Sequence, residues 1–289
     1  MSDLTIYSDE ELKAIQSLEL ECLKAVMLIC KENDIEYFAT GGTALGAVRH
    51  KGFIPWDDDI DIGMTRENYR KFLLVAPRCL PKQYHLQTPY DSKRNPYAYA
   101  KVRIDGTRFV EYCNRNVDMH HGVYIDIFPF DEVPDDEESN RKQFKQVQKL
   151  IRLFSLRQSP DVSVEPHTFF ERTRAAARCV LHLICQLMPY DTVFKKLEET
   201  VTKYDGTNQQ AIACLFSPVR LTEYVLLCDL YPLCEAEFMD VSIMIPGSYN
   251  TYLTTHYGDY MRLPPKERRF GHKPYEVFLG LMDHRREKS

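Results

Sequence analysis

The segment that most limits the possible folds is a run of aspartates, Asp57 to Asp59 and Asp61, in which the last is flanked by Ile60 and Ile62. Apolar neighbours draw these carboxylates toward the interior, where like charges raise one another's pKa and call for a countercharge. Because side chains alternate along a strand, Asp59 and Asp61 should point to the same face. They could then share a divalent cation, and carboxylate oxygens suit Mg²⁺ or Mn²⁺ better than zinc.

A pair of glycines precedes the acidic run. The β-prone residues 35–39 lead into Gly41-Gly42, and residues 44–50 suit a helix that starts directly after them. Strand, glycine turn and helix start, in this order, can present backbone N–H groups to an anion. Each feature alone is weak, since short acidic pairs often lie in solvated turns and paired glycines usually mark turns. Their combination favours a metal and phosphate site over a solvated turn.

This combination resembles the nucleotidyltransferase fold, in which a glycine turn holds nucleotide phosphates and an Asp-x-Asp pair holds their metal. The longer string from Gly41 to Gly63 is similar to the LicD family, bacterial phosphocholine transferases whose animal relatives include fukutin-related protein. Residues 124–131 resemble the family's second motif and supply its third carboxylate, Asp126. Residues 257–265 together with His272 are similar to its C-terminal signature. The resemblance spans residues 37–130 and 246–272, and no motif is recognised in residues 141–225.

The resemblance implies attack of an acceptor hydroxyl on the β-phosphorus of a CDP-linked donor, most often CDP-choline. Phosphocholine would pass to a glycan or glycolipid, and CMP would leave. Asp59, Asp61 and Asp126 are the expected catalytic residues and the expected ligands of Mg²⁺ or Mn²⁺, with Asp61 or Asp126 as general base. The expected substrate contacts are Gly41, Gly42, Thr43, Arg49, Lys51, Trp56, Asp58, Arg103 and His272. Lys101 is a further candidate for phosphate binding.

The donor and the acceptor stay open. A choline head group requires aromatic faces, because a quaternary ammonium is held by cation–π attraction. The candidate rings are Trp56, Tyr97, Tyr99, Tyr257 and Tyr260, although aromatic side chains more often belong to a core. CDP-ribitol or CDP-glycerol as donor, nucleotidyl transfer, and an inactive nucleotide-binding scaffold are the alternatives. The presence of all three carboxylates argues against the scaffold. Lipopolysaccharide and teichoic acid are both possible acceptors.

The distribution of helix and strand patterns predicts an α+β fold in a single domain, residues 1–289. In residues 1–134 a capping box at Ser8 opens a helix to about residue 33, and a second helix is expected to begin at Thr65 or Asn68 and to run to about residue 76. Strand-like runs at 35–39, 60–62, 84–87, 97–104, 108–113 and 123–128 predict a mixed sheet, which the resemblance implies is nucleotidyltransferase-like. Residues 135–289 should be mainly helical, with helices near 137–156, 169–188, 191–204 and 248–257. Two short strands are expected around Met239-Asp240.

Charge and composition limit the classes of partner and the cellular compartment that we expect. The formal net charge is −5, without the basic excess of a nucleic-acid binder, so no nucleic-acid partner is expected. The sequence shows no secretory signal and no apolar run long enough to span a bilayer, and its nine cysteines include no Cys-x-x-Cys pair, which favours a reduced, cytoplasmic protein. No obligate protein partner is evident. Residues 175–188 could contact the inner membrane surface peripherally, but their length and mixed pattern favour a buried core helix.

Overall fold

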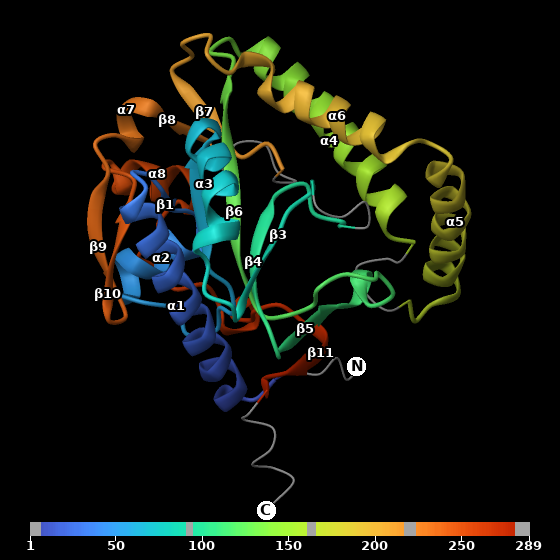
Figure 1. Cartoon of the computed structure of the whole chain (residues 1–289), viewed down its shortest axis with the longest axis horizontal. Coiled ribbons are helices and arrows are strands. Elements are labelled where there is room, and N and C mark those ends of the chain that lie inside the picture. Colours follow the sequence, from blue (N-terminus) through green and yellow to red (C-terminus); the bar gives the residue numbers. More distant parts are fainter. Residues whose placement is uncertain (1–6, 91–94, 161–165, 217–223, 281–289) are drawn as a thin grey trace, which may run out of the picture.

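A mixed β-sheet forms the centre of the molecule (Figure 1). The computed structural model describes residues 7–90, 95–160, 166–216 and 224–280. The sheet has the order β1 (Phe38–Ala39), β2 (Asp61–Thr65), β6 (Tyr124–Val133), β4 (Ala100–Ile104) and β3 (Tyr84–Gln87). β2 and β6 are parallel, and the other neighbours on this path are antiparallel. The predicted α+β fold with a mixed sheet is therefore confirmed.

β6 is long enough to join two parts of the molecule. Its first half pairs with β2 and β4, and its last residues pair with β7 (Ala211–Ala213), which in turn pairs with β8 (Tyr224–Leu226). Ile125 and Ile127 of β6 are fully buried in the main core, which also contains Cys22 and Val26 of the first helix. Because side chains alternate along a strand, Asp126 points to the opposite face of the sheet.

Two helices cover the core face of the sheet. α1 (Asp9–Glu32) and α3 (Arg66–Cys79) contact each other and β6. The predicted capping box at Ser8 is present, with Glu11 as its partner, and it sets the start of α1 as expected. Thr65 caps α3. The sequence thus predicted both helices, because capping residues and apolar spacing are local signals.

The β1 edge of the sheet is covered by α2 (Gly41–His50) and by the hairpin of β9 (Cys234–Phe238) and β10 (Val241–Ile245). α8 (Tyr249–Tyr257) packs against α2, and α7 (Leu227–Leu230) packs against α8 and β8. α2 includes both glycines, so the prediction that the helix starts after them was wrong. Gly41 has a φ of +53°, a conformation that glycine adopts at little cost, and it can therefore open the first turn itself.

Three helices form an arm beside the sheet: α4 (Glu137–Gln158), α5 (Phe169–Gln186) and α6 (Tyr190–Val201). α4 and α6 pack around a second apolar cluster that includes Val147, Phe154 and Leu197. α5 contacts α4 and lies at the outer edge of the molecule (Figure 1). The prediction of a buried core helix here was wrong, because most of the apolar side chains of α5 are exposed.

Several short elements were not predicted. β11 (Pro274–Phe278) pairs with β5 (Arg108–Glu111), and β7, β8 and α7 were also missed. Three short 3₁₀ helices lie at η1 (Tyr112–Asn114), η2 (Thr202–Tyr204) and η3 (Lys266–Arg268). Elements of three to five residues depend on distant partners, which local patterns do not reveal. Within the described residues, no helix combines the length and apolar character needed to cross a bilayer.

Candidate active site

The start of α2 is fitted closely against the acidic run. A β-carbon on Gly42 would come within 2.6 Å of Asp57 Oδ2, so only glycine lets the helix approach the carboxylate in this way. The Thr43 hydroxyl accepts a hydrogen bond of 2.8 Å from the backbone N–H of Asp61. The N–H of Gly41 donates to the Tyr252 hydroxyl at 3.1 Å. Thr43 thus ties the start of α2 to the strand that carries Asp61, and Gly41 ties it to Tyr252 of α8.

Three neighbouring strands place Asp61, Asp126 and Lys101 next to one another. Asp61 is the register partner of Asp126, and Asp126 is the partner of Lys101. Register partners project to the same face of a sheet. Lys101 Nζ lies 2.6 Å from Asp126 Oδ1, and the two side chains are only 2% and 9% exposed. Burial raises the pKa of Asp126, and Lys101 opposes that rise.

The Lys101 ammonium also contacts aromatic rings. It lies 3.5 Å from the ring centroid of Tyr124, 4.3 Å from that of Tyr97 and 5.3 Å from that of Tyr99. Two of the rings considered for choline therefore already face a cation of the protein itself. The sequence did not reveal this, because a cation–π contact depends on how the strands pair.

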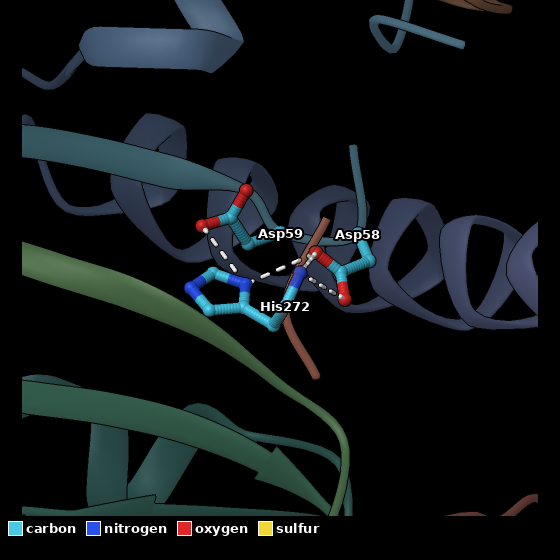
Figure 2. Close-up of side chains that lie close together, drawn as sticks. All are labelled: Asp58, Asp59 and His272. Carbon is cyan, nitrogen blue, oxygen red and sulfur yellow. Dashed lines mark hydrogen bonds and ion pairs between the residues drawn. The ribbon is translucent and has the colours of Figure 1, made fainter. Parts of the chain in front are cut away.

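Asp58, Asp59 and His272 form a second charged group at the start of β2 (Figure 2). Asp58 is completely buried and accepts hydrogen bonds from the Tyr7 hydroxyl and from both the backbone N–H and Nδ1 of His272, the last at 3.0 Å. His272 Nδ1 also lies 3.9 Å from Asp59 Oδ2. The hydrogen bond that His272 donates to Asp58 and the charge of Asp59 raise the pKa of His272 to about 10, despite the opposing effect of burial.

Two further carboxyl groups lie close to this group. Burial, together with the charges of Asp59 and Asp58, raises the pKa of Asp57 to about 8. Glu19 of α1 is 2% exposed, and burial and the same aspartates raise its pKa well above the usual value. Sequence analysis missed Glu19, although a glutamate among the apolar residues of α1 is an unusual position and was a usable signal.

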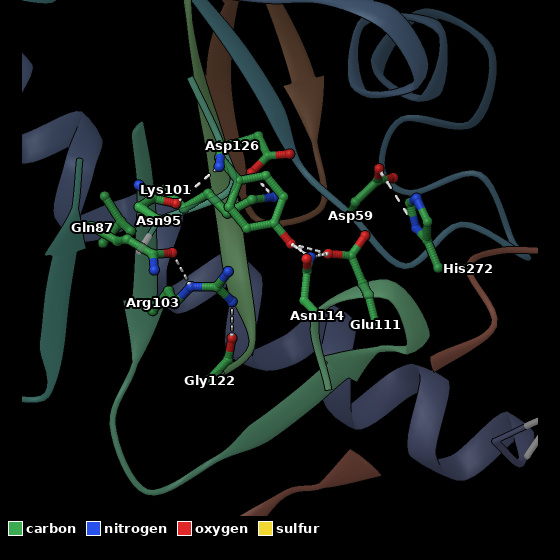
Figure 3. Close-up of polar contacts among 12 residues, drawn as sticks. Asp59, Gln87, Asn95, Lys101, Arg103, Glu111, Asn114, Gly122, Asp126 and His272 are labelled. Atoms are coloured by element: carbon green, nitrogen blue, oxygen red, sulfur yellow. Dashed lines mark hydrogen bonds and ion pairs between the residues drawn. The ribbon is translucent and has the colours of Figure 1, made fainter. Parts of the chain in front are cut away.

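A polar network continues from Lys101 along β4 and β5 (Figure 3). Arg103 is 1% exposed; its Nε donates to Gln87 Oε1 at 2.6 Å and its Nη1 to the carbonyl of Gly122 at 2.8 Å. Its Nη2 is buried and forms no hydrogen bond with the described residues. Glu111 accepts hydrogen bonds from the Tyr97 hydroxyl and from Asn114. Burial would raise the pKa of Glu111, but Lys101 and Tyr97 outweigh it and lower that pKa.

The remaining predicted substrate contacts surround the C-terminal end of α2. Arg49 Nη1 donates to the carbonyl of Tyr260 at 2.6 Å, and the Arg269 guanidinium lies 5.3 Å from the ring centroid of Trp56. Lys51 is exposed and pairs with Glu237 of β9 at 3.0 Å. Arg49, Lys51 and Trp56 thus each contact the C-terminal half of the chain, and their predicted roles in substrate binding stay predictions.

The carboxylates fit a hard divalent cation. Asp59 and Asp126 have raised pKa values because they are buried among like charges, and a bound cation would offset both effects. Within the described part of the chain, Asp58, Asp59 and His272 are the group whose potential ligand atoms all lie within 4.8 Å of one another. The predicted ligands Asp59, Asp61 and Asp126 are not brought that close, because Asp126 pairs with Lys101 and Asp59 faces His272. That ligand set stays a prediction.

The segments that form this site are similar to those of known proteins. Residues 34–156 match a family model described as LicD/FKTN/FKRP, nucleotidyltransferase domain. Over 271 residues the chain is 28% identical to the lipopolysaccharide cholinephosphotransferase LicD of Haemophilus influenzae, an alignment that covers 92% of this chain and 98% of that protein. Uncharacterized proteins of Rickettsia typhi and Rickettsia prowazekii are 37% and 40% identical over 81 and 77 residues, covering 28% and 25% of this chain and 26% and 29% of those proteins.

Proposed function

Because this chain belongs to the LicD family of transferases, we propose that it moves phosphocholine from CDP-choline to a hydroxyl group of a glycan or glycolipid. The observation that carries the proposal is the similarity to the Haemophilus influenzae lipopolysaccharide cholinephosphotransferase over nearly the whole of both chains. CMP would be the second product. Lipopolysaccharide is the first acceptor to test, and teichoic acid is the second.

In this proposal the carboxylates have two roles, metal binding and proton acceptance. Asp59, Asp61 and Asp126 would hold Mg²⁺ or Mn²⁺, which neutralises the diphosphate of the donor when it is bound. Asp61 or Asp126 would accept the proton of the acceptor hydroxyl. The raised pKa of Asp126 supports this role, because a carboxylate of ordinary pKa is a poor proton acceptor near neutral pH. Glu19 and Asp57 are two further carboxyl groups whose pKa values are raised by the nearby charges of Asp58 and Asp59.

Arg103 is our candidate ligand for the donor diphosphate. Two of its guanidinium nitrogens are fixed by Gln87 and Gly122, and the third is buried without a hydrogen bond to the described residues. A buried donor of this kind usually has a partner, and charge-assisted bonds from arginine to phosphate are among the strongest available. Lys101, two residues earlier on β4, would present a second positive charge on the same face.

One observation favours a different donor as the second candidate. Tyr97, Tyr99 and Tyr124 already surround the Lys101 ammonium, and Trp56 faces Arg269. A quaternary ammonium would have to share these rings with a like charge, which is unfavourable. CDP-ribitol and CDP-glycerol carry uncharged head groups and meet no such conflict.

A donor panel tests the proposal directly. The protein would be incubated with Mg²⁺ or Mn²⁺, with lipopolysaccharide or teichoic acid as acceptor, and with CDP-choline, CDP-ribitol or CDP-glycerol in turn, and CMP would be measured. We expect CMP from CDP-choline together with a choline-labelled acceptor, and neither product when a chelator is added. CMP from CDP-ribitol or CDP-glycerol alone would overturn the choline assignment. Release of phosphocholine with CMP attached to the acceptor would indicate nucleotidyl transfer.

Matched variants test the carboxylates in the same assay. Asp59→Asn and Asp126→Asn should lower the rate by about 100-fold or more, because each removes a charge at the reacting groups. Asp240→Asn is the control, since Asp240 is an exposed aspartate that pairs with Lys24. Full activity of a folded Asp59→Asn protein would disprove its role as a metal ligand.

A further inference from the structure

The outer face of α5 is apolar, and it is exposed among the residues that the structure describes. Seven large apolar side chains are between 49% and 84% exposed: Phe169, Phe170, Val180, Leu181, Leu183, Ile184 and Leu187, the last directly after the helix. At 100° per residue they fall on one broad side of the helix. A surface helix normally turns such a side toward the core. In Figure 1, α5 lies at the edge of the molecule, beyond α4.

The opposite, narrower side of α5 attaches the helix to the protein through polar contacts. Arg178 donates to the carbonyl of Ser159 at 3.1 Å, and His182 Nδ1 donates to the carbonyl of Leu156 at 2.8 Å. His182 and Cys185 are the buried residues of the helix. α5 is thus oriented with its more polar stripe inward and its apolar side outward. Because hydrogen bonds fix this orientation, the exposed apolar side is a defined feature of the fold.

Positive charge borders the apolar side. Arg172 and Arg174 are exposed, and helical geometry places them on the two opposite borders of the apolar side. Glu171 is the single acidic residue of α5, and it is used in the capping box with Thr168. The helix therefore carries more positive than negative charge, although the whole chain has a net charge of −5. Arginines that flank an apolar helix side can reach phosphate groups while the apolar residues enter the lipid.

We propose that α5 binds the surface of a membrane that contains anionic phospholipid. The helix would lie in the plane of the membrane, with the seven apolar side chains among the acyl chains and with Arg172 and Arg174 at the phosphate level. A second copy docked through its own α5 fits the face less well, because the acidic residue that its α5 offers, Glu171, is already used in the capping box. The inference depends on the surface of α5 and is independent of the reaction proposed above.

Vesicle flotation tests this inference. The full-length protein would be mixed with vesicles of phosphatidylcholine alone, or of phosphatidylcholine and phosphatidylglycerol, and the floating fraction measured. We expect clear binding to the anionic vesicles and weak binding to the neutral ones. The double variant Leu183→Ser/Ile184→Ser should bind about tenfold less or weaker still, because it removes two large apolar contacts. Arg172→Gln/Arg174→Gln should reduce binding to the anionic vesicles by about tenfold.

Leu74→Ser is the matched control, since Leu74 is 77% exposed but lies on α3, away from this face. Leu187→Ser, at a residue that is 84% exposed, replaces the double variant if circular dichroism shows that the latter is unfolded. Equal flotation of the wild-type protein and the folded α5 variants would overturn the inference, as would failure of the wild-type protein to bind either vesicle. Light scattering without lipid measures the oligomeric state. If the wild-type protein were a dimer and the α5 variants were monomers, the face would bind a second copy of this chain and the membrane proposal would be overturned.

Discussion

At the scale of single residues, the buried pair of Lys101 and Asp126 has the largest consequence for stability. Both side chains are almost fully buried, and removal of one partner leaves the other charge without compensation in a medium of low polarity. We predict that Lys101→Met lowers the free energy of unfolding by about 3–5 kcal/mol when no divalent cation is present. Denaturant titration with a chelator measures this loss. Lys196→Met, at an exposed pair with Glu199, should change stability very little.

A second prediction at this scale concerns His272. Its pKa is about 10 in the folded protein and 6.5 when unfolded, so its contribution to stability is complete below about pH 6.5 and is lost as the pH rises toward 10. Asp57, with a raised pKa of about 8, also reduces stability as the pH rises, but mainly below pH 8. Between pH 8 and pH 10 the melting temperature should therefore fall more steeply for the wild type than for His272→Gln.

His167→Gln, which alters an exposed histidine just before α5, is the control for this experiment. It should follow the wild-type profile throughout. If His272→Gln also followed it between pH 8 and pH 10, the ion pair with Asp58 would not contribute to stability as we infer. The chelator stays in every sample, so that metal binding does not add its own pH dependence.

The sequence predicted some residues of the site and not others, for physical reasons. Alternation along a strand singled out Asp59 and Asp61, and the resemblance of residues 124–131 to a family motif singled out Asp126, which the structure places beside Asp61. The hydrogen bond between Asp58 and His272 could not be predicted, since the two residues are 214 positions apart in the chain. Glu111 was missed for the same reason, because the pairing of β5 with β11 places it opposite Pro274 and so close to His272, more than 160 positions away.

At the scale of elements, α2 depends on two glycines in different ways. A β-carbon on Gly46 would meet the backbone carbonyl of Gly52 at 2.4 Å, whereas one on Gly42 would meet only the side chain of Asp57. We predict that Gly46→Ala destabilises the protein by about 1–3 kcal/mol, because the backbone must move. Gly42→Ala should retain a near-normal melting temperature but lose most of its transfer activity, because Asp57 is displaced. Thermal melts and CMP assays on both variants separate the two effects, and an active Gly42→Ala enzyme would contradict this account.

The helices show where local patterns stop being informative. The bounds of α1, α3 and α4 follow from capping residues and were predicted within a few positions. α5 was also predicted as a helix, but it was expected to be buried in the core and its apolar side is exposed. Apolar periodicity shows that a helix has an apolar side, and it does not show whether that side is turned to the core or away from it. The turn of α5 is set by Arg178 and His182, whose acceptors lie on another segment.

At the scale of the whole molecule, the concentration of carboxyl groups at one end of β2 predicts a response to divalent cations. A cation that binds only the folded state raises its stability according to the cation's concentration. We expect Mg²⁺ or Mn²⁺ to raise the melting temperature of the wild-type protein by several degrees, while Asp61→Asn should abolish most of the increase. Differential scanning fluorimetry with and without chelator measures both. Asp240→Asn should behave as the wild type, and an equal response of Asp61→Asn would place the cation elsewhere.

Asp58 joins segments that are far apart in the chain, since it accepts hydrogen bonds from Tyr7 and from His272. Contacts between such distant positions form late in folding, after the cost of closing a large loop has been met. During synthesis, the glycine pair, β2 and β6 can associate before residue 272 has left the ribosome, but Asp58 then lacks its histidine. The acidic end of β2 can therefore be completed only after nearly all of the chain has been synthesised, because His272 lies close to its C-terminal end.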